Sequence, residues 1–481
     1  MTAGTVARAE GPDLLERAFK LRENATTVGT EVIGGITTFF VMAYIIALNP
    51  IILNYVGNPS VKDNPGPGFP QTVAVTALTA GVLTIAMGLY ANRPFAMAAG
   101  LGLNAVVAYQ LVLGKPPLPW PQAMGIILME GVVITVLVLT GLRELILNAI
   151  PLALKRAIGV GIGLFILLIG LVNAGIVVKG GAIPVTLSAL NTGPIITVVI
   201  GLALTLLLFA RGVKAALLLG IVGTTIIAGV LHAVFQQYTV STAPNTAVLP
   251  ATWVEAPDFA NALRGLDLGA FATIGALATV LAVFTIMLSD FFDTMGTVIG
   301  IGGQAGWLDQ SGRLPGVKRI LLVDSIGAAF GGLMSASSNT TYIESAAGVS
   351  SGARTGLASV VTGVLFLLAM FLSPVVAVIP PEATAPALVI VGFLMAGIAT
   401  KIDLTEIDEG LPALLTMVVM PFTYSITNGI GAGFVTYAFI KLVRGKARDV
   451  HPLMWVVSIA FILYFAQAVY APAFGVGPYR E

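Results

Sequence analysis

Two stretches decide how this chain folds: Phe284-Thr-Ile-Met-Leu-Ser-Asp-Phe-Phe-Asp-Thr-Met-Gly-Thr297 and Ser335-Ala-Ser-Ser-Asn-Thr-Thr-Tyr-Ile-Glu344. They belong to hydrophobic segments that nevertheless contain, or are joined by, acidic residues: Asp290, Asp293, Asp324 and Glu344. Insertion scales put one carboxylate at the bilayer centre at about 2.5–3.5 kcal/mol unfavourable. Carboxyl groups kept at that depth usually face a wet cavity and handle a substrate, an ion or a proton. The pattern therefore predicts a transporter whose site is built from these stretches.

The composition is that of a membrane protein. Of the 481 residues, 57% are hydrophobic and 10% are charged, whereas soluble domains average about 25% charged residues. Apolar runs approach the ~20 residues needed to cross a bilayer, and the 55 glycines fit close helix packing in lipid. An all-α polytopic protein is therefore expected. A net charge of +1 argues against nucleic acid as a partner, and without cysteine the chain has no disulfide or thiolate site.

Hydropathy predicts a series of membrane segments separated by a polar stretch at 237–267. Basic residues concentrate in alternate loops if the N-terminal segment lies inside, so a cytoplasmic N-terminus is expected. The segment at 453–472 is either a fifteenth crossing or a helix at the membrane face. The predicted segments are 31–53, 71–90, 94–113, 121–141, 156–178, 193–210, 214–236, 268–302, 317–334, 335–353, 356–379, 384–400, 410–426, 428–444 and 453–472.

The two halves of the chain carry a short internal similarity. Glu130-Gly-Val132 parallels Thr362-Gly-Val364, and Thr37-Thr-Phe-Phe40 parallels Ser289-Asp-Phe-Phe292. Seven segments separate each pair, so a duplicated second half would be inverted in the membrane; chance similarity is the alternative. Inverted repeats with interrupted helices at matching positions are a recurring transporter plan, with the site at mid-membrane.

Segments 94–113 and 335–353, each third in its half, are short and rich in small residues. Small residues let extended backbone lie deep in the membrane when protein or a wet cavity surrounds it. A half-helix that starts at mid-depth presents unpaired N–H groups to a ligand. Asn104 and Glu344 stand where these half-helices are expected to begin, which makes both candidates for binding. The alternative is a pair of kinked helices packed through small residues.

The eighth segment places two acids on one helical face, because Asp290, Asp293 and Thr297 recur at spacings of three and four. Two carboxylates one turn apart repel, so the pair is expected to take up and release a proton. The alternative is that one Asp caps or cross-links neighbouring helices. Glu344 is the strongest single candidate for a functional acid.

Other polar groups carry weaker predictions. Asp324 has either a site role or a bond to the backbone of the eighth or tenth segment, and Glu130 is expected to be structural. His232 and His451 lie near segment ends, and no metal spacing, phosphate loop or nucleophile elbow occurs. No metal, cofactor or enzymatic activity is therefore expected. A membrane-embedded hydrolase using paired acids and a passive channel are the rival classes.

Six stretches spread over nearly the whole chain carry a family resemblance: Phe19-Lys-Leu-Arg-Glu-Asn24, Thr37-Thr-Phe-Phe-Val-Met-Ala-Tyr44, Gly100-Leu-Gly-Leu-Asn104, Asp290-Phe-Phe-Asp-Thr-Met-Gly-Thr297, Asn339-Thr-Thr-Tyr-Ile-Glu-Ser345 and Thr423-Tyr-Ser-Ile426. In these the sequence resembles the guanine/hypoxanthine (azaguanine-type) purine permease branch of the nucleobase–ascorbate transporters. The resemblance implies fourteen crossings in a seven-plus-seven inverted repeat, in the plasma (inner) membrane. It also implies a core domain that moves against a gate domain, and a homodimer through the gate domain as a candidate assembly.

The expected domains follow from this plan. The first repeat, 31–236, contains core 31–141 and gate 156–236. The second repeat, 268–444, contains core 268–379 and gate 384–444. Three further parts flank the repeats: a cytoplasmic N-terminal segment at 1–30, an extracellular or periplasmic loop at 237–267, and a C-terminal segment with an extra hydrophobic helix at 445–481.

By the same resemblance, the base binds between the third and tenth crossings. The implied substrate-binding residues are Glu344, Asp293, Asp290, Asn104, Tyr342 and Thr341. The candidates for proton coupling are Asp293, Asp290 and Glu344, and the accessory polar residues are Asp324, Glu130, Thr297 and Asn339.

The implied function is import of purine bases (guanine, hypoxanthine and, as a further candidate, adenine) together with a proton. The alternatives are uracil, xanthine or ascorbate as the solute, or Na⁺ as the coupling ion. Thr297 stands where some uracil- and xanthine-type relatives place a His or an acid, which disfavours uracil.

Overall fold

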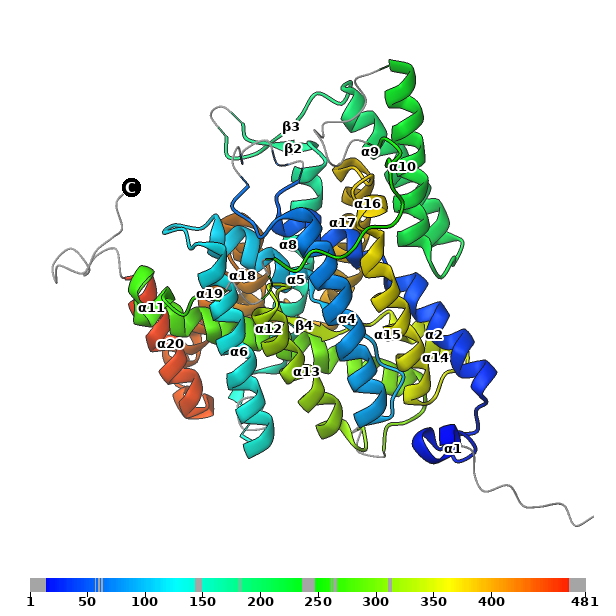
Figure 1. The fold of residues 1–481 in the computed structure, drawn as a ribbon. Helices are drawn as coiled ribbons and strands as arrows, with labels where there is room; N and C mark the ends of the chain where they lie inside the picture. Colours follow the sequence, from blue (N-terminus) through cyan, green and yellow to red (C-terminus); the bar gives the residue numbers. More distant parts are fainter. Residues whose placement is uncertain are drawn as a thin grey trace, which may run out of the picture.

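The computed structural model describes residues 14–56, 58, 61, 64–142, 149–180, 183–235, 247–260, 262, 266–309 and 314–466. Parts of the predicted segments at 1–30, 237–267 and 445–481 lie outside the described residues. Within the described part, ten helical stretches are long and apolar enough to cross a membrane. The prediction of a helical multi-pass membrane protein is thereby confirmed (Figure 1).

The helices follow the predicted segments closely. The first half contains α1 (Leu14–Phe19), α2 (Val28–Met42), α3 (Ile45–Leu53), α4 (Phe69–Ala91), α5 (Leu101–Ala105), the π-helical turn η1 (Val106–Val112), α6 (Trp120–Thr140), α8 (Leu152–Asn173), α9 (Gly193–Ala210) and α10 (Ala216–Phe235). The second half contains α11 (Ala270–Thr273), α12 (Ala276–Gln304), α13 (Val317–Leu333), α14 (Ser345–Ser350), α15 (Gly356–Ala369), α16 (Ser373–Val376), α17 (Pro381–Ala396), α18 (Ile407–Thr423), α19 (Ile426–Val443) and α20 (Pro452–Phe465).

The first membrane segment differs from the single helix expected over 31–53. It is divided into α2 and α3 at Ala43 and Tyr44. α3 also contains Pro50, which cannot donate to the carbonyl of Ile46 within that helix. Tyr44, at the junction of α2 and α3, is 1% exposed and lies in the interior.

Two short strands lie at the centre of the bundle. Strand β1 (Met97–Ala99) pairs antiparallel with β4 (Asn339–Thr341), with Ala98 opposite Thr340. Flanking hydrogen bonds extend the ladder, from Gly100 N to Ser338 O and from Tyr342 N to Ala96 O, both at 2.9 Å. Backbone at membrane depth must find partners within the protein, and this pairing satisfies the two extended stretches mutually. Another strand pair, β2 (Val177–Val178) with β3 (Thr186–Leu187), joins α8 to α9.

The helices around the strands are held at close range by glycines. α4 packs against α15, and α6 packs against α13. At the second of these contacts, a Cβ placed on Gly131 of α6 would lie 2.1 Å from the backbone nitrogen of Ala329 in α13. Only glycine permits this separation of α6 from α13, and α13 in turn packs against β4.

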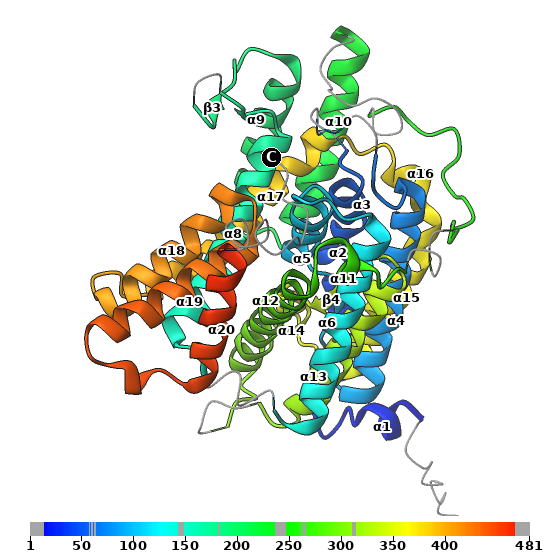
Figure 2. The same ribbon diagram turned by 90° about the vertical axis from the view of Figure 1, so that its left-hand side faces the viewer.

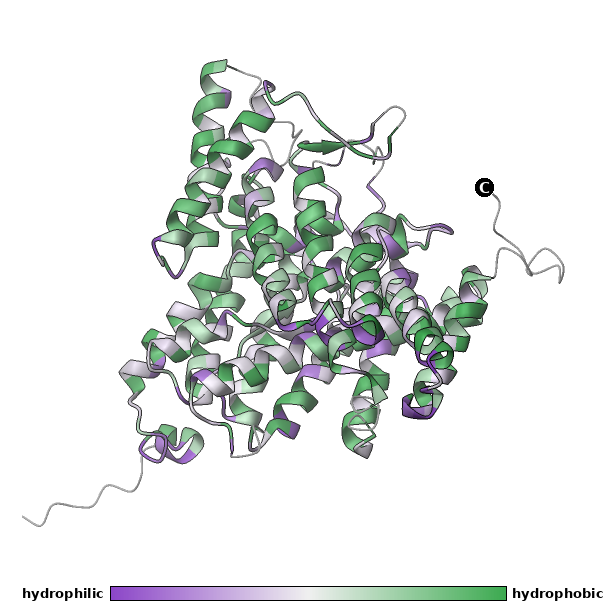
Figure 3. Cartoon of the chain, turned by 180° about the vertical axis from the view of Figure 1, so that it is seen from behind, coloured by the Kyte–Doolittle hydropathy of each residue, from purple (hydrophilic) through white to green (hydrophobic). Residues whose placement is uncertain are grey.

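The outer surface is suited to lipid. Apolar side chains such as Phe422 of α18 (77% exposed) and Ile226 of α10 (62% exposed) point outward. In Figure 3 hydrophobic colour covers most helices, whereas hydrophilic colour gathers near the centre and at the ends of helices. Figure 2 shows α18, α19 and α20 on one side, α4, α13 and α15 on the other, and α12 between them.

We expect Gly131→Ala to destabilise the fold, because the added methyl group meets backbone rather than a flexible side chain. Overpacking of this kind costs about 1–3 kcal/mol, so the melting temperature of the purified protein in detergent should fall. Gly159→Ala in α8 is the matched control, because a Cβ there meets nothing within 4 Å and alanine favours the helix. Equal melting temperatures for the two variants would contradict this account of the α6–α13 contact.

Candidate functional site

A cavity of about 100 Å³ lies beside the strand pair. It is bounded by the ends of β1 and β4, by α12, and by α8 and α17. The lining residues are Tyr44, Gly100, Leu101, Gly102, Leu103, Ile162, Ser289, Asp293, Thr297, Thr341, Tyr342, Ile343, Glu344, Val391, Leu394 and Met395. Its walls therefore combine residues from both halves of the chain.

The tenth-segment acid occupies the junction between β4 and α14. Glu344 is the residue that precedes the first turn of α14, as expected from the sequence. Its Oε1 accepts a hydrogen bond from the hydroxyl of Tyr44. Beside it, the hydroxyl of Tyr342 donates to the carbonyl of Ala99 at 2.5 Å, which fixes the tyrosine across the two strands.

The eighth-segment acid that reaches the cavity is Asp293. It lines the cavity together with Ser289 and Thr297, which lie one turn before and one turn after it along α12. Residues four apart lie almost above one another on a helix, so these three form one polar strip. Asp293 also lies close enough to Glu344 for the two carboxyl groups to interact electrostatically.

Asp324 anchors the strand rather than lining the cavity. Its Oδ1 accepts hydrogen bonds from the backbone nitrogen of Thr341 at 2.9 Å and from the Thr341 hydroxyl at 2.8 Å. Its Oδ2 accepts from the hydroxyl of Thr294 at 2.8 Å. Asp324 thus ties α13 to both β4 and α12, in agreement with the backbone-bonding alternative considered for it.

Four other predicted residues lie behind the cavity wall, all of them fully buried: Asp290, Asn104, Glu130 and Asn339. Asp290 and Glu130 lie within interaction distance of each other, between α12 and α6, and Ser338 donates to Glu130 Oε2 at 3.4 Å. Asn339 donates to the carbonyl of Ser337 at 3.1 Å. The Asn104 amide has no hydrogen-bond partner within the described residues, and α5 begins before it, at Leu101.

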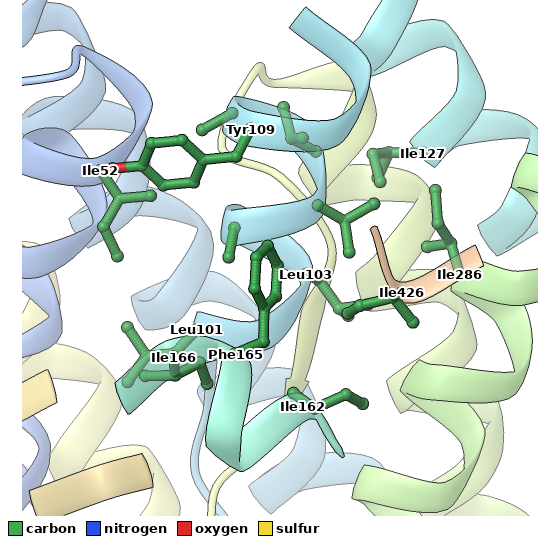
Figure 4. Packing of buried hydrophobic residues seen from close by; sticks show 14 of the residues in the cluster. Ile52, Leu101, Leu103, Tyr109, Ile127, Ile162, Phe165, Ile166, Ile286 and Ile426 are labelled. Carbon is green, nitrogen blue, oxygen red and sulfur yellow. The ribbon is translucent and has the colours of Figure 1, made fainter. Parts of the chain in front are cut away.

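The opposite wall of the cavity is apolar. Ile162 of α8 and Val391, Leu394 and Met395 of α17 face the polar strip. Figure 4 shows Ile162, Phe165 and Ile166 of α8 beside Leu101 and Leu103 of α5. Sequence reasoning missed this wall because its residues resemble any other apolar residue of a membrane helix. It also missed Ser289 and Tyr44, although Ser289 stands four residues before Asp293.

The electrostatic setting of the two cavity acids is unusual. Within the described residues, no Lys or Arg forms an ion pair with Asp293 or Glu344. By contrast, Asp408 at the start of α18 contacts three basic side chains, those of Lys441 (3.2 Å), Lys446 (2.8 Å) and Arg444. Buried carboxyl groups without a cation are costly unless a proton or hydrogen-bond donors neutralise them. The cavity is therefore suited to a guest rich in donors.

In the part of the chain that the structure describes, no three His, Asp or Glu side chains come together in a way that could hold a metal ion. The arrangement of two acids, five hydroxyl-bearing residues and an apolar wall instead suits a flat, partly polar molecule.

Comparisons with known proteins point in one direction. The sequence profile of the Permease family, Xan_ur_permease, matches residues 29–432. The guanine/hypoxanthine permease PbuG of Bacillus subtilis is 38% identical over 458 residues, which cover 93% of this chain and 98% of that protein. The adenine permease AdeP of Escherichia coli is 38% identical over 456 residues, covering 95% and 97% of the two chains.

Among solved structures, the transmembrane domain of the cyanobacterial bicarbonate transporter BicA has a similar fold. The TM-score is 0.59 at 14% identity, and the match covers 84% of this chain and 97% of that one. Identity at this level concerns the fold alone. The family profile and the two permeases confirm the resemblance found in the sequence, and the chain belongs to the nucleobase permease family, in its guanine/hypoxanthine-type branch.

Proposed function

We propose that the protein imports purine bases across the plasma membrane together with protons. The observation that carries the proposal is the placement of Glu344 and Asp293, from two different segments, on one cavity without a basic partner among the described residues. Relatives named for guanine/hypoxanthine and for adenine are equally similar, at 38% identity. Overall similarity therefore supports the purine class and does not favour one base.

The chemistry of the cavity supports a purine as the guest. A purine is flat and carries several N–H donors on its edge, and carboxylates accept such donors. Each charge-assisted hydrogen bond contributes about 1.5–3 kcal/mol net. Glu344 and Asp293 supply the acceptors, the hydroxyls of Thr297 and Thr341 supply further polar contacts, and the ring of Tyr342 offers a face for stacking.

We assign different roles to the two acids of α12. Only Asp293 lines the cavity, so Asp293 is the substrate contact. Asp290 lies behind it, close to Glu130, and two adjacent carboxyl groups in a dry environment share a proton rather than both ionising. Asp290 is therefore the proposed proton-coupling residue, with Glu130 as its partner. Asn104, buried in α5, is proposed to support the cavity wall.

The helix contacts support the seven-plus-seven inverted repeat. In that plan α4, α6, α8, α9 and α10 correspond to α13, α15, α17, α18 and α19. The packing of α4 on α15 then matches that of α13 on α6, and α8 on α18 matches α17 on α9. The contact between α9 and α10 likewise matches that between α18 and α19. β1 with α5, and β4 with α14, would then be the two interrupted crossings.

The cavity walls suit a core that moves against a gate. All polar lining residues come from the proposed core, and α8 and α17 belong to the proposed gate. A further set of contacts joins core and gate on one side of the cavity. Gln110 of η1 accepts from the backbone nitrogen of Ile426 at 2.9 Å and donates to the hydroxyl of Thr427. Alternating access would require these contacts to break.

The orientation and assembly rest on the sequence. Basic residues in alternate loops support a cytoplasmic N-terminus. A homodimer would form through the gate helices, which expose apolar side chains such as Phe422.

The site assignment is tested with Glu344→Gln and Asp293→Asn. Each change replaces a charged acceptor by an amide, and we expect uptake affinity for guanine or hypoxanthine to fall about 10-fold to 150-fold, the equivalent of one charge-assisted bond. Initial rates of labelled base uptake at matched surface expression provide the measurement. Glu406→Gln, at an exposed position before α18, is the control. Undiminished uptake in both cavity variants would contradict the assignment of Glu344 and Asp293 to substrate binding.

The coupling assignment is tested with Asp290→Asn. The variant should still bind base and exchange it across the membrane, because Asp293 and Glu344 remain, but it should lose accumulation against a gradient.

Uptake of guanine, hypoxanthine, adenine, xanthine and uracil, with and without a proton uncoupler, identifies the substrate class in the native protein. Uptake that requires Na⁺ would indicate sodium coupling. Uptake that the uncoupler does not change would indicate a passive channel.

A further inference from the structure

A buried tyrosine from the first membrane segment reaches the cavity. Tyr44 stands at the break between α2 and α3, is 1% exposed, and donates its hydroxyl proton to Oε1 of Glu344. We propose that Tyr44 is a positioning residue that holds the Glu344 carboxylate in the orientation that binds the guest. This inference rests on the proposed function, because it concerns the acid assigned to the purine base.

The backbone around Tyr44 is held firmly. Its carbonyl accepts hydrogen bonds from Ala47 N at 3.1 Å and from Leu48 N at 3.0 Å, which begin α3. From this junction of α2 and α3, Tyr44 lines the cavity. Glu344 lies 300 residues further along the chain. The contact therefore joins the first crossing to the β4–α14 junction.

The acceptor capacity of Glu344 explains why one donor matters. A carboxylate offers two oxygens with about four acceptor positions. Tyr44 takes one position on Oε1, and no other side chain is hydrogen-bonded to Glu344 within the described residues. The remaining positions belong to a half-buried carboxyl group that lines the cavity. A single fixed donor thus orients the group without consuming the positions that a purine edge needs.

The Tyr44 hydroxyl is also a donor suited to the carboxylate form of Glu344. A donor bound to a carboxylate favours ionisation, and the ionised group is the one that accepts N–H donors. The titratable groups that face Glu344 among the described residues are Tyr44 from the α2–α3 junction, Tyr342 from β4, and Asp293 from α12. Of these groups, Tyr44 is the one that donates a hydrogen bond to the Glu344 carboxyl group.

The test compares Tyr44→Phe with Tyr55→Phe. Both changes remove one hydroxyl from a buried tyrosine. Tyr55 lies just after α3 and donates to the carbonyl of Ala108 at 2.8 Å, outside the cavity. Equilibrium binding of hypoxanthine to the purified full-length protein is the readout. Tyr44→Phe should raise Kd about tenfold, the effect of one charge-assisted bond, with little change in the maximal rate of uptake. Tyr55→Phe should leave Kd within about twofold of the native value.

A double-mutant cycle with Glu344→Gln separates positioning from packing. If Tyr44 acts through the carboxylate, adding Tyr44→Phe to Glu344→Gln should change Kd by no more than about twofold. The same loss in both backgrounds, or equal losses for Tyr44→Phe and Tyr55→Phe, would overturn the inference. A native protein that binds no purine base would instead refute the proposed function, so the two failures are distinguishable.

A second variant serves if Tyr44→Phe does not fold. Fluorotyrosine in place of Tyr44 keeps the ring and strengthens the hydroxyl as a donor. The stronger donor should hold the ionised carboxylate to lower pH, so the pH at which half the affinity is lost should fall. An unchanged pH dependence of hypoxanthine binding would contradict the role given to Tyr44.

Discussion

The burial of carboxyl groups without basic partners is the constraint on which the rest of this structure depends. Asp408 shows the ordinary solution, because three cations surround it near the end of a helix. Asp293 and Glu344 lack that solution within the described residues, and an apolar environment penalises their charge. The surrounding structure provides hydroxyl donors, chiefly Tyr44, and a cavity in which a guest can complete the neutralisation. In the proposed function, the substrate supplies the hydrogen-bond donors that these two carboxyl groups lack.

The pair of strands β1 and β4 holds Glu344 in place at the cavity. Extended backbone in a membrane must be satisfied by protein, and β1 and β4 satisfy each other through the register from Met97–Thr341 to Ala99–Asn339. Asp324 then fixes β4 to α12 and α13 through Thr341 and Thr294. Because these bonds hold the strand, Glu344 at its end has a defined position and Asp293 faces it from α12. An acid that anchors backbone therefore supports the acids that face the cavity.

The sequence was sufficient for the class of fold and for the family, and two of the acids it singled out, Asp293 and Glu344, line one cavity in the structure. Acidic residues in apolar segments carry a strong signal, since lipid tolerates them only for a reason. The junction of α2 and α3 at Tyr44 was not predicted, because hydropathy is continuous across it. The apolar wall of α8 and α17 could not be predicted either, since residues that face a cavity and residues that face lipid have the same character. Hydropathy alone does not distinguish them.

The two acids of α12 illustrate a further limit of prediction from sequence spacing. Residues three apart differ by about 60° around a helix and residues four apart by about 40°, so Asp290 and Asp293 were reasonably placed on one face. The boundary between cavity and interior falls between them: Asp293 joins Ser289 and Thr297 at the cavity, and Asp290 turns to Glu130. In the proposed mechanism this division matters, because an acid behind the wall can exchange a proton without competing for the base. Both acids belong to α12, so a change of charge on one alters the field at the other, and binding can be coupled to protonation with no further element.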